Sequence, residues 1–324
     1  MKNLTLRSKL IAVFILLGVV PMLSVATFSV YEATTTAQDL TKKRLESIRD
    51  LQKNQIQEYF KGIAGQVRTL SNMSFMNEAM SDFSLAISLI ESDKSHIIDS
   101  NALKARYDYQ VENTPNSGAT EFEAWYPKNY SAQVLQDLYI GRNTNEIGAK
   151  EDLDRAPNDM YYNEVHNQYH NALRGFLREF GYYDIFLVNP KNGQIVYSVF
   201  KEVDYGTSLL TGPYKDTGIA KVFKQALTAN SADDTFFEDF APYAPSYGAP
   251  ASFIASPIMN NNNTIQGVLI FQMPVDEINS ITAKVSEKKD FNTLEAFIIG
   301  EDNRLRTDTV LDEENTLGNL IEAP

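Results

Sequence analysis

The sequence predicts an α+β protein with an N-terminal transmembrane helix, a long stalk helix, a module built on a five-stranded antiparallel sheet, and the start of a second module. Three observations predict this class: an uncharged apolar run near the N-terminus, a helical stripe of apolar residues after it, and strand-like segments beyond residue 182. The chain has 324 residues, of which 43% are hydrophobic, so it can form a folded core. A typical domain takes about 150 residues, and the length therefore suggests roughly two domains.

The N-terminal segment has the pattern of a membrane anchor. Residues 1–9 contain basic residues and no acid, and residues 10–31 contain no charged side chain. A helix of about 22 residues spans roughly 33 Å, which is enough for the hydrocarbon core of a bilayer. The basic flank is expected to remain as a cytoplasmic tail, which places the following residues outside the inner (cell) membrane, in the periplasm or outside the cell. A cleaved signal peptide is the alternative, since residues 24–26 are small, but the apolar run is long for one and continues to Tyr31.

Residues 32–112 are expected to form one long stalk helix. The first part lacks proline and carries apolar side chains at a spacing near 3.6 residues, namely Leu45, Ile48, Ile56, Tyr59, Ile63, Val67 and Leu70. The helical pattern continues to about Tyr109 and breaks at the loop-like ENTPNSGAT. A polar helix with one narrow apolar stripe needs a partner, either its own globular domain or the same helix of a second copy. We therefore expect a homodimer.

Residues 113–286 are expected to form the membrane-distal module, and residues 287–324 the start of a second one. A helix over Tyr161–Phe180 ends at Gly181. Strands are expected at Tyr183–Val188, Gln194–Phe200, Phe236–Phe240, Ala251–Ile258 and Thr264–Met273, with helices at Gly218–Leu227 and Pro274–Ser286 and a strand-turn-strand at Leu294–Asp308. The first two strands flank a turn and predict a hairpin, and the helices are expected on one side of the sheet.

Composition argues against several classes of function. The formal net charge of -13 disfavours a nucleic-acid partner, and the absence of cysteine removes disulfides, thiolate catalysis and cysteine zinc sites. His166 and His170 lie four residues apart on a predicted helix, but the HExxH pattern and a third ligand are missing, so no metal is expected. Neither a glycine-rich phosphate loop nor a nucleophile beside a base is recognisable. We therefore expect no cofactor, no catalytic residue and no enzymatic activity.

Several stretches resemble bacterial methyl-accepting chemotaxis proteins. The opening KNLTLRSKLIAVFILLGVVPML, followed by IRDLQKNQIQEYF and LSNMSFMNEAM, is similar to the start of these receptors. The extracytoplasmic Cache sensor region of this family is resembled, in order, by WYPKNY, LQDLYI, IGAKEDLD, HNQYHNALRGFLREFGYYDIFLVNPKNGQIVYSVFKEVDYGTSL, GPYKDTG, FAPYAPSYGAPASFIASPI and GVLIFQMPVDEIN. The closing FIIGEDNRLRTDT is similar to the first hairpin of the proximal module in double-Cache receptors. The resemblance implies a PAS-like Cache module, a truncated second Cache module, and downstream signalling domains absent from this fragment.

The same resemblance points to candidate ligand-binding residues. In the Cache family the ligand pocket is surrounded by the second strand, the loop and helix after it, and the third strand. Polar and aromatic residues on these elements are Tyr197, Lys201, Tyr205, Tyr214, Asp239, Tyr243, Ser246 and Tyr247. Tyrosines supply an apolar wall with a hydroxyl group, Lys201 is suited to pair with a carboxylate, and Asp239 is suited to receive an ammonium group. The alternative is that the tyrosines pack on the sheet as ordinary core residues.

These observations predict a membrane-anchored sensor that binds a small molecule, namely an organic acid, an amino acid or an amine, and signals across the membrane as a chemotaxis receptor. The complete arginine–tryptophan–tyrosine signature of amino-acid-binding Cache pockets is absent, so an amino acid is not favoured over the other two classes. The sensor region of a receptor histidine kinase or nucleotide cyclase is the alternative. An adhesion or structural stalk is a third possibility, and it predicts no saturable ligand.

Overall fold

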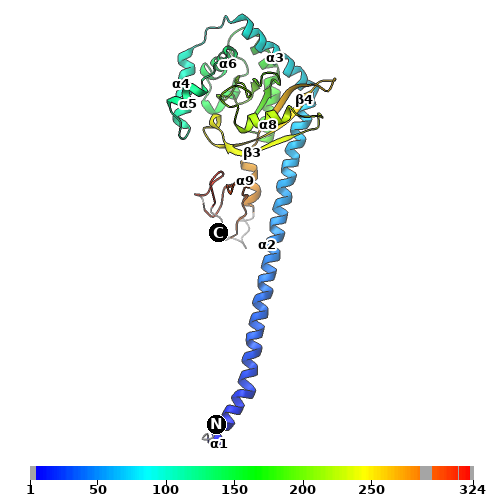
Figure 1. The fold of residues 1–324 in the computed structure, drawn as a ribbon, viewed down its shortest axis with the longest axis vertical. Helices are drawn as coiled ribbons and strands as arrows, with labels where there is room; N and C mark the ends of the chain where they lie inside the picture. Colours follow the sequence, from blue (N-terminus) through cyan, green and yellow to red (C-terminus); the bar gives the residue numbers. More distant parts are fainter. Residues whose placement is uncertain (1–4, 285–293, 313, 322–324) are drawn as a thin grey trace. The chain divides into compact units, whose positions relative to one another are not determined.

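A computed structural model describes residues 5–284, 294–312 and 314–321 of the chain (Figure 1). The chain divides into two units, Met1–Ile56 and Gln57–Pro324. The first unit is helical throughout its described residues, and the second contains the sheet. Each unit is described by itself.

The first unit begins with α1 (Leu6–Phe14), continues through a π-helical turn η1 (Ile15–Val19), and enters α2 (Val20–Ser71), whose last part belongs to the second unit. The π-helical turn comes just before Pro21, which has no amide hydrogen to donate to the helix. The continuous helix Leu6–Ser71 is long and apolar enough to cross a membrane, and none of its most apolar stretch is buried. These grounds are length and composition, which a signal sequence near the N-terminus shares.

The single stalk helix expected over residues 32–112 is divided into three helices. After α2 ends at Ser71, α3 covers Ser74–Asp93 and α4 covers Ser100–Asn113. The prediction missed both breaks because apolar residues keep the helical spacing across them, although the Asp99 side chain, which caps α4 by accepting from two backbone amides, is a recognisable start signal. Because α3 buries seven side chains in the core, residues 74–112 belong to the sheet module rather than to a stalk.

The sheet has five antiparallel strands, as predicted. They are β1 (Asp184–Val188), β2 (Ile195–Ser198), β3 (Phe236–Pro242), β4 (Pro250–Met259) and β5 (Ile265–Gln272). Their spatial order is β2-β1-β5-β4-β3, and every neighbouring pair is antiparallel. The first two strands form the predicted hairpin. The α+β class is therefore confirmed.

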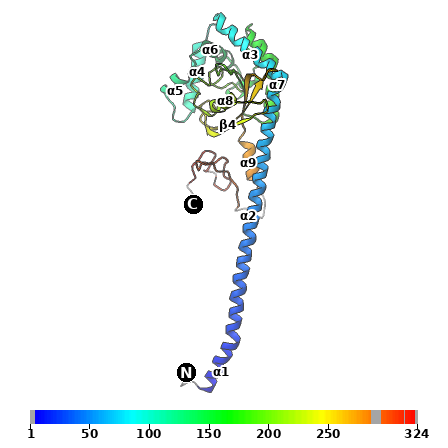
Figure 2. The same cartoon turned by 45° about the vertical axis from the view of Figure 1, so that its right-hand side comes forward.

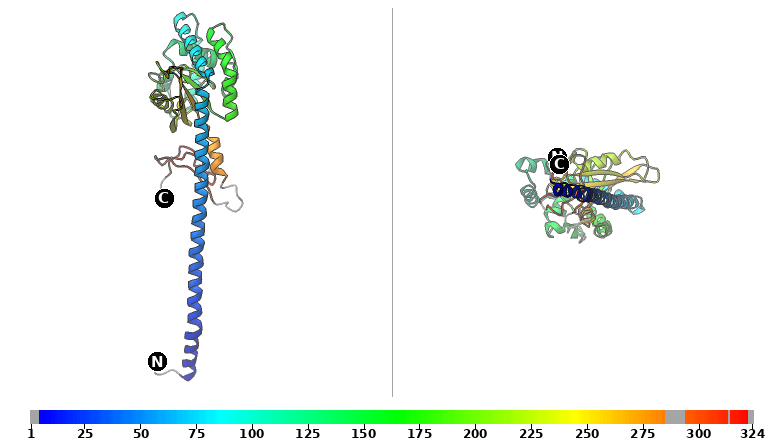
Figure 3. Two further views of the ribbon diagram at one scale, coloured as in Figure 1. Left: turned by 90° about the vertical axis from the view of Figure 1, so that its right-hand side faces the viewer. Right: turned by 90° about the horizontal axis from the view of Figure 1, so that it is seen from below.

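Helices cover both faces of the sheet, whereas the sequence predicted them on one side. Phe253 of β4 lies against α8 (Gly218–Ala226), because a Cβ added to Gly218 would come 3.2 Å from its ring. On β5, Gly267 faces Met80 of α3. Its partner in β4 is Ile258, which is five residues from Phe253, and an odd separation along a strand places two residues on opposite faces. Helix α3 therefore covers the face opposite to α8. The helix α7 (Tyr161–Phe180) packs beside α3 on that second face (Figure 3) and ends as predicted at Gly181, which has a φ of 71°.

The remaining elements surround the sheet or follow it. They are α5 (Ala119–Trp125), α6 (Tyr130–Gln136), η2 (Asp137–Gly141), η3 (Ile147–Asp152), η4 (Ala244–Ser246) and α9 (Asp276–Ala283). Helices α4, α5 and α6 lie close together (Figure 2). In the described part of 294–321 only isolated bridges occur, between Ile299 and Leu305 and between Arg304 and Leu320. A second module starting there remains a prediction.

Candidate functional site

Six buried polar residues gather where β1, the loop after β2 and the end of β3 meet. We call them the acid cluster; its members are Asp184, Lys201, Glu202, Asp204, Tyr214 and Tyr243, and none is more than 5% exposed. Three carboxyl groups and one amine in a core are unusual, because removing a charged group from water is costly unless it is paired. The cluster is therefore the first place to look for a function.

Asp184 fixes the shape of the loop that carries the cluster. Its carboxylate accepts hydrogen bonds from Ser198 Oγ (2.6 Å) and from the backbone amides of Val199 (2.9 Å) and Phe200 (3.0 Å). The chain then turns at Lys201, whose φ of 60° is in the left-handed region. Burial raises the pKa of Asp184 to about 6, although these hydrogen bonds favour the ionised form.

Helices α4 and α6 hold the same loop from its other side. Gln136 Nε2 donates to the carbonyl groups of Val203 (2.9 Å) and Tyr205 (2.8 Å). The Tyr107 hydroxyl donates to Gln136 Oε1 at 2.7 Å. The loop is therefore anchored through its backbone, which leaves the side chain of its central residue, Asp204, available for other contacts.

Two lysines supply positive charge to the cluster. Lys150 Nζ lies 3.2 Å from Glu202, and both side chains are less than 10% exposed. Lys201 Nζ donates to the carbonyl of Val199 (2.8 Å) and lies over the ring of Tyr139. Burial lowers the pKa of Lys201 to about 7 and raises that of Glu202 to about 8, so both groups can change charge near neutral pH.

Two polar atoms of the cluster have no hydrogen-bond partner among the described residues: Asp204 Oδ1 and the Tyr214 hydroxyl. The other oxygen of Asp204 accepts from the Tyr243 hydroxyl at 2.5 Å, and the rings of Tyr214 and Tyr243 lie 6.2 Å apart, edge to face. Burial raises the pKa of Asp204 to about 7. A buried polar atom left unpaired costs about 1–3 kcal/mol, so these two atoms are suited to contact a bound molecule or water.

Two of the predicted pocket residues lie in a second cluster instead. We call it the histidine–tyrosine cluster; it contains Tyr139, Tyr162, Tyr169, Tyr197, Tyr205, His166 and His170, packed around Phe83. Alternation along β2 explains this, because Tyr197 faces α3 and α7 whereas Ser198 faces Asp184. Tyr205 donates to, or accepts from, the hydroxyl of Tyr162.

The hydrogen bonds of this second cluster fix the histidine tautomers. His170 Nε2 lies 2.6 Å from the carbonyl oxygen of Glu151, which can only accept, so this nitrogen carries the hydrogen. His170 Nδ1 then accepts from the Tyr197 hydroxyl at 2.7 Å. By the same reasoning His166 Nδ1 donates to the carbonyl of Asp154 at 2.6 Å. Burial lowers the pKa of both imidazoles, that of His170 to about 2, so both are neutral.

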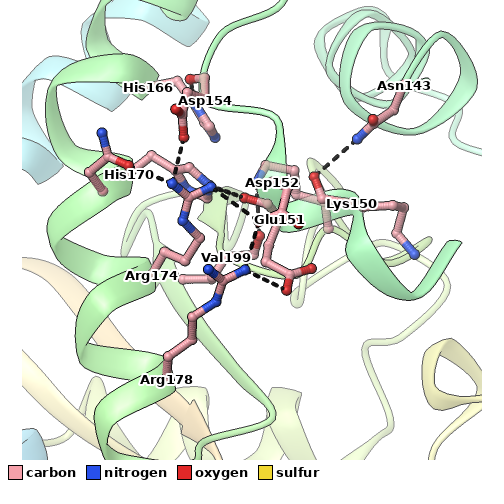
Figure 4. A network of polar contacts seen from close by, with 12 residues as sticks. Asn143, Lys150, Glu151, Asp152, Asp154, His166, His170, Arg174, Arg178 and Val199 are labelled. Atoms are coloured by element: carbon pink, nitrogen blue, oxygen red, sulfur yellow. Dashed lines mark hydrogen bonds and ion pairs between the residues drawn. The ribbon is translucent and has the colours of Figure 1, made fainter. Parts of the chain in front are cut away.

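The loop 150–154, which includes the last residues of η3, lies against α7 (Figure 4). Arg174 and Arg178, which follow the histidines at four-residue intervals on α7, bind its acidic side chains and the carbonyl of Glu151 at 2.7–3.7 Å. The same loop begins with Lys150, whose Nζ pairs with Glu202 of the acid cluster. Helix α7 therefore positions a charge of the acid cluster through this loop.

The other three predicted pocket residues are members of neither cluster. Asp239 is half exposed, and its carboxylate is bound by Arg306. Ser246 Oγ accepts from Gln272 Nε2 at 3.0 Å, and Tyr247 packs edge to face on Tyr109. Of the eight predicted residues, Lys201, Tyr214 and Tyr243 lie together in the acid cluster.

The prediction missed the acidic members of the cluster. Glu202 and Asp204 flank a valine in the sequence KEVDYG, which has the appearance of a solvated loop because charged residues are usually exposed. A usable signal was present in Asp184, which stands at the start of an otherwise apolar strand. A charged residue in such a position needs hydrogen-bond partners, and the following strand and loop supply them through Ser198, Val199 and Phe200.

Comparisons with known proteins give distant structural similarity. No family model and no curated protein matches the chain. The chain is similar to the sensor domain of the histidine kinase DctB from V. cholerae, with 17% identity, a TM-score of 0.28, and coverage of 54% of this chain and 60% of that one. It is also similar to the ligand-binding domain of the Campylobacter jejuni chemoreceptor Tlp3 in complex with 4-methylisoleucine, with 11% identity, a TM-score of 0.28, and coverage of 67% and 66%. The chain thus spans about two thirds or less of the length of these structures.

Proposed function

We propose that the chain is a membrane-anchored, extracytoplasmic sensor that binds a small molecule at the acid cluster. The observation that carries this proposal is the pair of unpartnered buried atoms, Asp204 Oδ1 and the Tyr214 hydroxyl. A carboxylate oxygen accepts hydrogen bonds, so among organic acids, amino acids and amines the cluster favours a ligand that carries an amino group. In this proposal the residues of the acid cluster bind the ligand and do not catalyse a reaction, so the protein is not an enzyme.

The ligand would act by changing the charge of the cluster. Because burial raises the pKa of Asp204 to about 7, this carboxyl group is partly protonated near neutral pH. An ammonium group beside Asp204 would favour the ionised carboxylate. The free energy of this charge interaction stabilises only the conformation that binds the ligand. A ligand with different affinity for two conformations shifts the population between them, which is the physical requirement for a sensor.

The proposed assembly is a homodimer held at the inner membrane by the N-terminal helix. Within the first unit the side chains of Leu40, Leu45 and Leu51 are 44–63% exposed, so α2 offers an apolar surface to a second copy. The apolar run before it supports a membrane location. Signalling as a chemotaxis receptor is the favoured output because of the sequence resemblance at the N-terminus, and a histidine kinase or cyclase is the alternative. An output domain identified on the same polypeptide would distinguish them.

The test is a thermal-shift screen of the full chain in detergent micelles against amines, amino acids, organic acids and purines. A ligand at a hundred times its dissociation constant should add about 2.7 kcal/mol of apparent stability. Asp204→Asn should abolish this shift, because the amide replaces the charged acceptor oxygen. Asp216→Asn is the matched control, since Asp216 is exposed two residues after Tyr214. A screen without any shift, or equal affinity in the Asp204 variant, would contradict the proposal.

A further inference from the structure

Arg306 joins the segment after α9 to the edge strand β3. Its Nε lies 3.0 and 2.9 Å from the two carboxylate oxygens of Asp239, and its Nη2 lies 2.9 Å from Asp239 and 2.9 Å from Asp302. Its Nη1 donates to the carbonyl of Arg304 at 3.0 Å. All three guanidinium nitrogens therefore have acceptors, and the Arg306 side chain is only 11% exposed. We call this arrangement the Arg306 clamp.

The segment leaves a space beside Gly300 that the guanidinium group of Arg306 fills. A Cβ atom added to Gly300 would overlap three atoms of the Arg306 guanidinium, so the group occupies the space that glycine leaves. A second contact lies beside it: Asn279 of α9 donates from Nδ2 to Asp308 at 2.6 Å and accepts from the Asp308 amide at 2.9 Å. The reciprocal Asn279–Asp308 pair and the space that Gly300 leaves for the guanidinium distinguish the clamp from an isolated surface ion pair, which is worth about 0–1 kcal/mol.

The clamp binds β3 at an irregularity in the sheet. The register between β3 and β4 shifts between Glu238 and Ala241, and Asp239 lies in this interval. Four residues after Asp239, Tyr243 enters the core and donates to Asp204. At about 3.3 Å per residue the two contacts are roughly 13 Å apart along one stretch of chain. Tyr243 and Asp239 therefore connect the acid cluster and Arg306 through one short stretch of chain.

We infer that the Arg306 clamp is the contact through which the acid cluster is coupled to the segment 294–321. The inference rests on the proposed function for its biological meaning, since the coupling would carry ligand occupancy from the cluster to the following part of the chain. Asp239, which is expected from the sequence to receive an ammonium group of a ligand, binds the guanidinium group of Arg306 in this structure and is not a member of the acid cluster. The physical coupling exists without a ligand, so it can be measured without one.

The experiment is amide hydrogen exchange of the full chain in detergent micelles, with variants at both ends of the path. Gly300→Ala keeps every charge but displaces the guanidinium group. Arg306→Lys keeps the positive charge but replaces the planar guanidinium, with its several N–H donors, by a single ammonium group. Each should speed exchange in residues 298–308 by about tenfold, as expected for the loss of one charge-assisted contact. Lys221→Met is the control, because it removes an exposed ion pair with Glu238 on the same strand and should leave 298–308 unchanged.

The coupling itself is tested by Tyr243→Phe, which removes the hydrogen bond to Asp204. This variant should change exchange in 298–308 when the clamp is intact and cause no further change when Gly300→Ala or Arg306→Lys is also present. Unchanged exchange in 298–308 in the Tyr243 variant, or equal effects with and without the clamp, would overturn the inference. The ligand screen is independent of this result, so failure of either proposal can be recognised separately. Unchanged exchange in α7 in each variant shows that the fold is retained.

Discussion

The acid cluster and the histidine–tyrosine cluster use similar side chains to different ends. Each hydroxyl of Tyr139, Tyr162, Tyr169 and Tyr197 has a partner, such as His170 for Tyr197 and Asp82 for Tyr169. In the acid cluster, by contrast, Asp204 and Tyr214 each have an unpaired atom, and carboxyl groups have pKa values near neutrality. His166 Nε2 also lacks a hydrogen-bond partner among the described residues, so the two clusters differ chiefly in the buried carboxyl groups of the acid cluster, and we propose that these receive a ligand.

The largest expected effect is on the histidine–tyrosine cluster. Phe83 is fully buried, and its ring centroid lies 4.9 Å from that of Tyr197 and 5.4 Å from that of Tyr162. Phe83→Ala should lower the free energy of unfolding by about 3–5 kcal/mol, because it removes buried apolar surface and leaves a cavity. Urea denaturation followed by tyrosine fluorescence measures this change. Leu85→Ala on the same helix is the control; its side chain is 52% exposed and the cost should stay within about 0.5 kcal/mol.

The second prediction concerns the ion pair between the clusters. Lys150→Met leaves Glu202 buried without its partner, and at pH 9 this should cost about 3–5 kcal/mol of unfolding free energy. At pH 6 the cost should be smaller, because burial already raises the pKa of Glu202 to about 8 and the group is then protonated. Urea denaturation at both pH values measures the difference. The double variant Lys150→Met with Glu202→Gln should lose the pH dependence, and a single variant with equal cost at both pH values would argue against a buried charge.

Asp204 should contribute a pH dependence of its own. An aspartate has an ordinary pKa of 3.8, and burial raises that of Asp204 to about 7. Between these values the folded state keeps a proton that the unfolded state has lost, so the contribution of Asp204 to stability is full below pH 3.8 and is lost as the pH rises to 7. Asp204→Asn should remove up to about 1.4 kcal/mol per pH unit from this slope. Denaturation curves across this pH range measure the slope. An unaltered slope in the Asp204 variant would mean that the carboxyl group is solvated in the folded state.

The sequence predicted the sheet well because strands and their turns are local patterns. All five strands and α7 lie within a few residues of their predicted bounds. The site was predicted less well, since membership of a buried cluster depends on which face of a strand a side chain occupies and on partners far along the chain. Tyr197 and Ser198 are adjacent in sequence but face different clusters, and Asp239 is held by a residue 67 positions later. Neither fact is contained in the spacing of tyrosines.

The smallest expected effect gives the sharpest comparison of the two clusters, because the same chemical change is made in each. Tyr197→Phe removes the donor to His170 Nδ1 and leaves that buried nitrogen unpaired, which should cost about 1–3 kcal/mol of unfolding free energy. Tyr214→Phe removes a hydroxyl that has no partner among the described residues, so stability should change by less than about 0.5 kcal/mol or increase. Both side chains are equally buried, and urea denaturation of the two variants under one condition measures the difference.

Ligand affinity should respond in the opposite order, falling in the Tyr214 variant and remaining in the Tyr197 variant. Equal loss of stability in both would mean that the Tyr214 hydroxyl is already satisfied, and the acid cluster would then be a structural core like its neighbour.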